Sequence, residues 1–213
     1  MATILAALLI SYLIGSIPTA YIFGRILKGI DIRKEGSGNV GATNALRVLG
    51  KGPGITVLIF DIFKGFLVAF FLADYFSARI PLIDPQNTHI MMGLACICGH
   101  NWTIFLRFKG GKGIASTFGV LLGLSWRIPG LGAVIAVLVA TWFAVFLISR
   151  IVSLASVLSA VAFPVSSFFL KLPPVFTALS LLLSLFVLIR HRTNLIRIFQ
   201  GKEPRLYFGK SKT

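Results

Sequence analysis

The sequence predicts an all-α, polytopic integral membrane protein with seven transmembrane helices, an N-terminus outside the cell and a cytoplasmic C-terminus. Three observations support this prediction. The 213 residues are 56% hydrophobic and 13% charged, whereas a soluble domain has roughly 25% charged residues. The apolar residues form long blocks, of the length that a helix needs to cross the hydrocarbon core of a bilayer. The basic residues gather in alternate loops between these blocks.

Each predicted helix corresponds to one apolar block, and the blocks occupy residues 3–23, 55–73, 90–106, 114–125, 131–149, 151–170 and 175–189. Residues 114–125 are few for a span, so this helix could be tilted, broken or partly re-entrant. The same holds for residues 55–73, which include Asp61 and Lys64. These two side chains are three positions apart, so they share a helical face and could neutralise each other.

The distribution of basic residues sets the expected orientation. With seven spans, one side of the membrane holds almost all of them, within residues 25–51, 107–112 and 190–212 and at Arg150. The other side holds only Arg79, Arg127 and Lys171. By the positive-inside rule the crowded side is cytoplasmic. The first basic residue, Arg25, follows the first block, so that block is expected to be a retained span and not a cleaved signal peptide.

The hexapeptide GSGNVG, residues 36–41, fits the G-x-G-x-x-G fingerprint of dinucleotide-binding folds, and Asp61 lies twenty residues after it. That fingerprint is meaningful only where a buried strand precedes the glycines and a helix follows them. Here the charged run of residues 31–35 precedes them. The hexapeptide therefore does not predict a dinucleotide site, and its surroundings have to show what it binds.

Polar residues cluster in four segments on the predicted cytoplasmic side: residues 36–47, 108–113, 153–156 and 190–194. Glycine-rich turns let backbone N–H groups point inward together, which suits phosphate, and neighbouring lysine or arginine adds charge-assisted hydrogen bonds. Residues 110–113 also lead into the apolar run at Ile114, where a helix N-terminus would favour an anion. The pattern predicts a phosphate site, although glycines that merely make tight turns would look similar. The net charge of +15 adds nothing, because membrane topology alone explains it, and it does not indicate nucleic acid.

Several kinds of chemistry are disfavoured by what the sequence lacks. Its six acidic residues show no paired spacing on the basic side, which disfavours carboxylate-held magnesium. Gly113 stands where a Walker A loop needs Ser or Thr, and no G-x-S-x-G elbow occurs. Two cysteines, Cys96 and Cys98, make no tetrahedral metal site by themselves. We therefore expect a site without metal and without a cofactor. His100 is equally consistent with a structural role and with a substrate contact.

Six motifs occur in a distinctive order, at residues 36–44, 61–65, 99–100, 108–113, 153–156 and 190–194. Together they resemble the bacterial membrane acyl-phosphate-dependent glycerol-3-phosphate acyltransferases over nearly the whole chain. The resemblance implies a single membrane-embedded acyltransferase domain of residues 1–213, in the bacterial inner membrane with its active site at the cytoplasmic face. Two departures are Thr103, where the family usually has proline, and Thr193, where it usually has glutamate.

The reaction implied by this resemblance is the transfer of a fatty acyl group from acyl phosphate to glycerol 3-phosphate, giving lysophosphatidic acid and phosphate, as the first step of phospholipid synthesis. The expected partners are these two substrates and bilayer lipids, without nucleic acid, and the protein is expected to be a monomer. The implied catalytic residues are Ser37, Arg47, Lys112, His191 and Asn194. The implied substrate-binding residues are Gly38, Asn39, Thr43, Asn44, Lys109, Gly110, Gly111, Gly113 and Ser156.

The group that accepts the proton of the attacking hydroxyl stays open at this point. His191 titrates in the right range, but the phosphate of the substrate, whose second pKa is about 6, is also suitable and is favoured. Two further function classes stay open as well. A transporter of a phosphorylated anion would place glycine-interrupted segments near the midplane within a repeat, and no repeat is evident here. A non-catalytic scaffold for anionic lipids explains the charge but not the polar pattern of residues 37–44.

Overall fold

Every regular element in residues 1–206, the part of the chain that the computed structural model describes, is a helix. Lys210 and Lys212, which were expected on the basic side, lie outside the described residues. The chain forms two compact units, residues 1–129 and residues 130–213. The prediction of an all-α protein is confirmed for the described residues. That both units form one functional domain stays a prediction.

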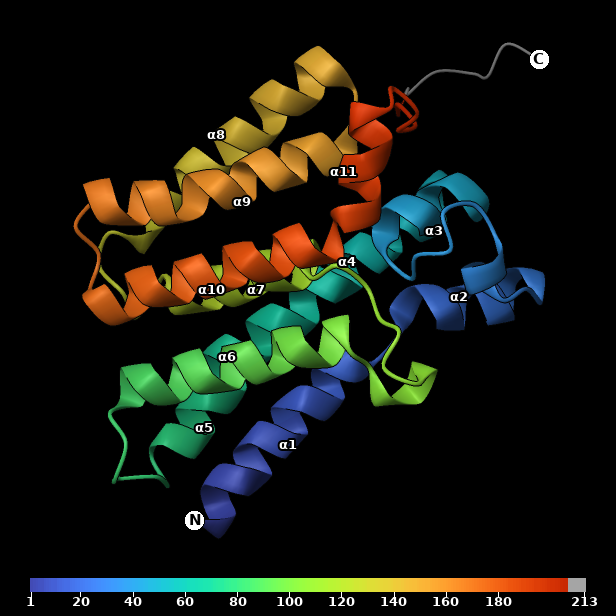
Figure 1. Ribbon diagram of the computed structural model, residues 1–213. Coiled ribbons are helices and arrows are strands. Elements are labelled where there is room, and N and C mark those ends of the chain that lie inside the picture. Colours follow the sequence, from blue (N-terminus) through green and yellow to red (C-terminus); the bar gives the residue numbers. More distant parts are fainter. Residues whose placement is uncertain (207–213) are drawn as a thin grey trace. The chain divides into compact units, whose positions relative to one another are not determined.

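The first unit is built on helices that alternate in direction. Its elements are α1 (Ala2–Ser16), α2 (Thr19–Lys28), η1 (Ile32–Lys34), α3 (Ala42–Val48), α4 (Lys51–Leu67), the π-helical turn η2 (Val68–Leu72), α5 (Ala73–Ser77), α6 (Pro85–Asn101), η3 (Ile104–Leu106) and α7 (Ile114–Leu124). Helices α1 and α6 lie side by side and run the same way, as their contacts and Figure 1 show. The loops after α1 and after α6 therefore lie at the same end of this unit.

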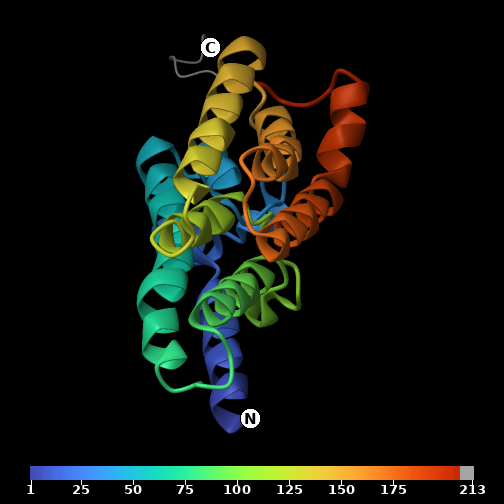
Figure 2. The same ribbon diagram turned by 90° about the vertical axis from the view of Figure 1, so that its left-hand side faces the viewer.

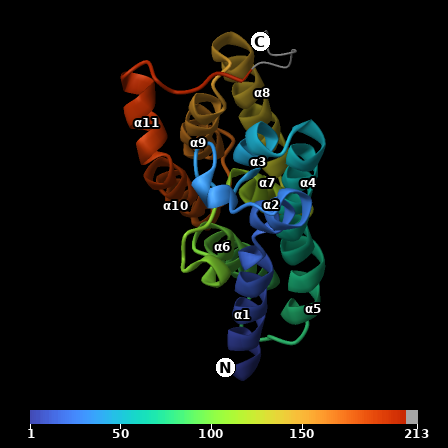
Figure 3. The same cartoon turned by 90° about the vertical axis from the view of Figure 1, so that its right-hand side faces the viewer.

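Glycines allow these helices to approach closely. A Cβ at Gly99 of α6 would lie 2.1 Å from the carbonyl oxygen of Tyr12 in α1. A Cβ at Gly119 of α7 would lie 1.9 Å from the carbonyl oxygen of Ile62 in α4. Neither position has room for a side chain, which is the usual basis of tight helix packing in membranes. Figure 3 shows α2 and α3 at the end of this unit that lies away from the N-terminus.

The first apolar block contains a break that the sequence did not reveal. Helix α1 ends before Pro18, and α2 starts immediately after it. The carbonyl oxygen of Ser16 accepts a hydrogen bond from Thr103 Oγ1 at 2.6 Å. The carbonyl oxygen of Ile17 accepts one from Lys64 Nζ at 3.0 Å. An unpaired carbonyl in an apolar environment costs several kcal/mol, so these two side chains make the break tolerable.

Asp61 and Lys64 form a buried ion pair, which confirms that they neutralise each other. Asp61 Oδ1 lies 2.9 Å from Lys64 Nζ, and both side chains are more than nine-tenths buried. The same oxygen accepts a hydrogen bond from Thr19 Oγ1 at 3.2 Å and lies 3.7 Å from His100 Nδ1. Residues from α2, α4 and α6 therefore meet at one carboxylate.

The second unit consists of α8 (Leu131–Ser149), α9 (Val152–Phe169), α10 (Pro174–Arg190) and α11 (Arg192–Phe199). Helices α8 and α9 form an antiparallel hairpin, and α11 is bent by 62° from α10 (Figure 2). Pro164 lies inside α9, so its missing N–H leaves the carbonyl of Ala160 without its helical donor. Ser184 of α10 donates a hydrogen bond to that carbonyl, which joins the two helices.

The prediction of a helical protein with several membrane-spanning segments is confirmed. A helix occurs in each of the seven predicted blocks of the described chain. Within residues 1–206, five helical segments are long and apolar enough to cross a membrane, and six are if the bent α10–α11 pair counts as one span. Helix α7, with 11 residues, reaches only about 17 Å, whereas the hydrocarbon core is about 30 Å thick. The number of seven spans and the orientation of both termini stay predictions.

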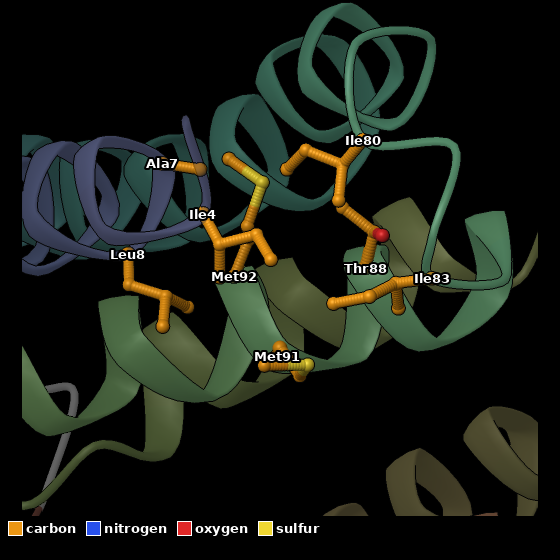
Figure 4. Close-up of a pocket in the computed structure, with 8 residues that line it drawn as sticks. All are labelled: Ile4, Ala7, Leu8, Ile80, Ile83, Thr88, Met91 and Met92. Atoms are coloured by element: carbon orange, nitrogen blue, oxygen red, sulfur yellow. The ribbon is translucent and has the colours of Figure 1, made fainter. Parts of the chain in front are cut away.

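A small apolar pocket lies at the end of the first unit near the N-terminus (Figure 4). Its lining residues come from α1, α6 and the segment between α5 and α6: Ile4, Ala7, Leu8, Ile80, Ile83, Thr88, Met91 and Met92. Its cavity volume of about 10 Å³ corresponds to about one water molecule. The pocket is too small for a substrate.

We expect Lys64→Met to lower the free energy of unfolding by about 3 kcal/mol or more, because it leaves the Asp61 carboxylate buried without its cation. The double variant Asp61→Asn/Lys64→Met, which also removes that charge, should be more stable than Lys64→Met alone. Thermal unfolding in detergent measures both effects. Lys51→Met, at an exposed position of the same helix, is the matched control and should unfold like the unaltered protein. A double variant less stable than the single one would contradict this account.

Candidate functional site

The segment before the first glycine loop is fixed by a carboxylate. Asp31 caps η1 by accepting the N–H of Arg33 at 3.1 Å, and the Arg33 guanidinium donates to the same carboxylate at 2.9 and 2.7 Å. The hydrogen bond from the Arg33 side chain lowers the pKa of Asp31 to about 2. The cap is therefore ionised at every physiological pH, and the chain enters the loop in a defined conformation.

Asn44 holds the first glycine loop together. Its buried Oδ1 accepts the N–H of Ser37 at 2.8 Å. Its Nδ2 donates to the carbonyl oxygens of Ile32 at 3.3 Å and Glu35 at 3.1 Å. Gly36 has a φ of 58°, and a Cβ there would lie 2.4 Å from Asn44 Oδ1. The structure thus places Asn44, an expected substrate-binding residue, in the framework of the loop, with the Ser37 side chain exposed at its tip.

The other expected residues of this loop and of α3 are partly accessible. Asn39, Thr43 and Arg47 are half-buried, and Arg47 stands in the last turn of α3. An apolar cluster that includes residues of this loop and of α3 consists of Ala20, Ile32, Val40, Ala45, Leu49, Val57 and Leu106. Because Leu106 belongs to η3 and Val40 to the first glycine loop, this cluster packs that loop against the segment that leads into the second one.

The second glycine loop folds back onto the end of α6. The N–H of Gly110 donates to the carbonyl of Asn101 at 3.2 Å, and the N–H of Gly111 donates to the carbonyl of His100 at 2.9 Å. These two N–H groups are therefore not the anion donors that the sequence pattern suggested. In the first turn of α7, however, N–H groups have no acceptor within the helix. The half-buried Lys112 lies one residue before the cap, Gly113, and Lys109 is exposed.

His100 connects this loop to the buried ion pair. Its Nδ1 faces Asp61, at 3.7 Å from Oδ1. A Cβ at Gly111 would lie only 2.1 Å from His100 Nε2, so the imidazole lies directly against the glycine backbone. His100 thus has a structural role, because it lies between Asp61 and the loop that carries Lys112.

In the second unit, His191 marks the bend between α10 and α11. The side chain is buried, and its Nδ1 lies 2.9 Å from the carbonyl oxygen of Val187. A carbonyl oxygen can only accept, so Nδ1 carries a proton. In the neutral ring the lone pair is therefore on Nε2. The bend fixes both the orientation and the tautomer of this imidazole.

Glu203 is a residue of this unit that sequence reasoning missed. Its Oε1 accepts hydrogen bonds from Ser153 Oγ at 2.8 Å and from Asn194 Nδ2 at 2.6 Å. Its Oε2 accepts one from Arg197 Nε at 2.7 Å. Burial raises the pKa of Glu203, but these hydrogen bonds and the Arg197 charge together lower it below its ordinary value. A single acidic residue in a basic tail was the signal that could have identified it.

Ser156, the last expected site residue, stands between two helices of the same unit. Its Oγ donates to the carbonyl of Val152 at 2.9 Å and accepts from Trp142 Nε1 at 3.3 Å. The structure thus positions Ser156 through α8 and α9, and Asn194 and His191 through α10 and α11. The expected residues from Ser37 to Gly113 belong to the first unit, and these three belong to the second.

Comparisons with known proteins identify the family. The model of the family described as glycerol-3-phosphate acyltransferase matches residues 5–201. Proteins of that name from Gloeobacter violaceus and Staphylococcus haemolyticus are 43% and 42% identical to this chain; the matches cover 92% and 95% of it, and 91% and 98% of those proteins. Two crystal structures of PlsY, an integral membrane glycerol 3-phosphate acyltransferase, also match. Its glycerol 3-phosphate form has a TM-score of 0.82 at 34% identity, covering 96% of each chain. Its lysophosphatidic acid form has a TM-score of 0.79 at 33% identity, covering 96% of this chain and 95% of that one.

This chain belongs to the glycerol-3-phosphate acyltransferase family, as the motif resemblance implied. The protein is thus an acyltransferase and an integral membrane protein of phospholipid synthesis. This result sets aside the transporter and scaffold alternatives, because the chain matches more than nine-tenths of the length of relatives that are named as acyltransferases.

The hydrogen bonds to Glu203 give the second prediction. Because its pKa is lowered in the folded state, its stabilising effect is complete above the ordinary value of 4.5 and is lost as the pH falls through the lower folded value. At pH 7, Glu203→Gln should reduce the hydrogen-exchange protection of α11 by about tenfold.

The protection of α11 in the unaltered protein should fall as the pH drops below the ordinary value, whereas that of Glu203→Gln should show no such step. Amides of α8, which Glu203 does not contact, are the internal control. Equal protection of α11 in both proteins at pH 7 would show that Glu203 does not hold the tail.

Proposed function

We propose that the protein transfers a fatty acyl group from acyl phosphate to the primary hydroxyl of glycerol 3-phosphate. In this reaction the hydroxyl oxygen forms an ester bond to the acyl carbon, the bond from that carbon to the phosphate oxygen breaks, and inorganic phosphate leaves. The product is lysophosphatidic acid. The observation that carries the proposal is the loop at Gly110–Gly113, which brings Lys112 to the N-terminus of α7 in a member of this family.

The chemistry explains why the site can dispense with a covalent nucleophile. Phosphate is a good leaving group in a mixed anhydride, so positioning and electrostatic stabilisation are sufficient. We assign Ser37, Arg47 and Lys112 to phosphate groups of the substrates. Since the N–H groups of Gly110 and Gly111 are already hydrogen-bonded, the first turn of α7 supplies the backbone donors instead. Gly38, Asn39, Thr43 and Lys109 complete the substrate-binding residues of the first unit.

His191, Asn194 and Ser156 serve the same reaction from the second unit. The proton of the attacking hydroxyl goes to a phosphate oxygen of the substrate, whose second pKa is about 6. His191, with Nδ1 committed to Val187, hydrogen-bonds the substrate through Nε2. No metal and no cofactor takes part in this proposal.

The membrane arrangement that fits this function has seven spans in a single domain of residues 1–213, with the N-terminus outside and the active site at the cytoplasmic face of the bacterial inner membrane. The concentration of basic residues in alternate loops supports this orientation. Acyl chains of substrate and product then stay among apolar helices, so they never have to leave the bilayer. The protein acts as a monomer in this proposal.

The donor class is tested by phosphate release from palmitoyl phosphate and glycerol 3-phosphate by the purified protein in lipid, with a metal chelator present. We expect turnover with acyl phosphate and none with acyl-CoA or acyl carrier protein. Lys112→Ala should lower kcat/KM by about 100-fold or more, because it removes the positive charge assigned to a substrate phosphate. Lys51→Ala, at an exposed position, is the matched control.

Folded protein that is inactive with every donor would overturn the proposed reaction. The transporter alternative would then be tested by flux of glycerol 3-phosphate into proteoliposomes. Retained activity of Lys112→Ala would overturn the assignment of this lysine while leaving the reaction intact.

The role of His191 is tested by His191→Asn, since the amide can still donate a hydrogen bond to the Val187 carbonyl. With the substrate phosphate as proton acceptor, kcat should stay within about tenfold of the unaltered value. A loss of several orders of magnitude in kcat, with binding of glycerol 3-phosphate unchanged, would instead identify His191 as the general base.

A further inference from the structure

Asn101, the last residue of α6, presents a buried acceptor without a partner. The residue is 1% exposed. Its Oδ1 forms no hydrogen bond to any of the described residues, 1–206. Buried side-chain oxygens in proteins are almost always hydrogen-bonded, so such an atom calls for an explanation. Asn101 is not among the site residues that the sequence motifs imply.

The carboxamide of Asn101 faces the N-terminus of α7. A Cβ at Gly113, the cap of that helix, would lie 2.7 Å from Asn101 Oδ1 and 3.2 Å from its Nδ2. Gly113 has a φ of 81°, and no side chain fits between it and the amide. The backbone carbonyl of Asn101 meanwhile accepts the N–H of Gly110. Asn101 therefore borders the second glycine loop.

The first turn of α7 and the Asn101 side chain suit different groups of a ligand. The first turn of α7 offers N–H donors and partial positive charge, which suit a phosphate. Oδ1 of Asn101 can only accept, so it suits a hydroxyl and not a phosphate oxygen. A ligand with a phosphate and a nearby hydroxyl would satisfy both. In glycerol 3-phosphate the hydroxyl nearest to the phosphate is the secondary one, at C2.

We propose that Asn101 Oδ1 accepts a hydrogen bond from the C2 hydroxyl of glycerol 3-phosphate and so determines specificity for this acyl acceptor. The inference rests on the proposed function, since it concerns the same site. It gives the buried oxygen its missing donor. It also leaves the primary hydroxyl, on the carbon farther from the phosphate, for the reaction.

The test compares glycerol 3-phosphate with propane-1,3-diol monophosphate, which keeps the phosphate and a primary hydroxyl but lacks the C2 hydroxyl. With palmitoyl phosphate as donor, the unaltered protein should show a kcat/KM at least about tenfold higher for glycerol 3-phosphate. Asn101→Ala should lower kcat/KM for glycerol 3-phosphate by about 10-fold to 100-fold. Its kcat/KM for the diol monophosphate should change by less than about threefold.

Asn87→Ala removes an exposed asparagine from the same helix and is the matched control, with both values unchanged. Asn101→Ser, which fills part of the space and keeps an oxygen, is the second variant and should recover part of the preference. An equal loss on both acceptors in Asn101→Ala would show that Asn101 only shapes the loop, and would overturn the inference.

The comparison of acceptors on the unaltered protein does not depend on the folding of any variant. If that protein uses both acceptors equally well, the inference is overturned and the proposed function stands. If it uses neither acceptor with acyl phosphate, the proposed function and the inference both fail.

Discussion

The need to pair every backbone carbonyl in an apolar environment determines how the first unit is built. The break at Pro18 exposes carbonyls, and Lys64 reaches one of them. A buried lysine needs a counter-charge, which Asp61 provides, and the same carboxylate faces His100. His100 in turn lies against Gly111. A chain of contacts thus connects the break at Pro18 to the second glycine loop.

The glycine loops are held by their own hydrogen bonds before any substrate arrives. Asn44 fastens one loop from within, and the end of α6 fastens the other through Gly110 and Gly111. A loop that is already ordered loses little conformational freedom on binding, which favours affinity and correct alignment. In the proposed reaction the anion is therefore recognised by the side chains of Ser37, Arg47 and Lys112 and by the start of α7.

Composition and periodicity predicted the apolar helices, because both depend on residues close together in the sequence, and the expected site residues came from the motif resemblance. Composition and periodicity did not predict the partners across helices. Lys64 pairs with the carbonyl of Ile17 and Thr103 with that of Ser16, over separations of 47 and 87 positions. Helix α3 was missed because its seven residues are too few for a periodic signal. Composition and periodicity also did not reveal that Asn44, an expected substrate-binding residue, holds its loop together, since no local rule identifies a polar residue that builds a loop.

The tail of the chain shows how a carboxylate can stand among residues that are proposed to serve an anionic substrate. A free carboxylate there would repel phosphate. Glu203 supplies the carboxylate in this structure, but Arg197 balances its charge, and Ser153 and Asn194 donate to one of its oxygens. Because these partners compensate the negative charge of Glu203, this residue can hold α11 to the start of α9 while the net charge of the surrounding residues stays positive. Its position nine residues after Asn194 also lets the chain close a short loop around the amide, so the hydrogen bond to Glu203 fixes the orientation of the Asn194 side chain.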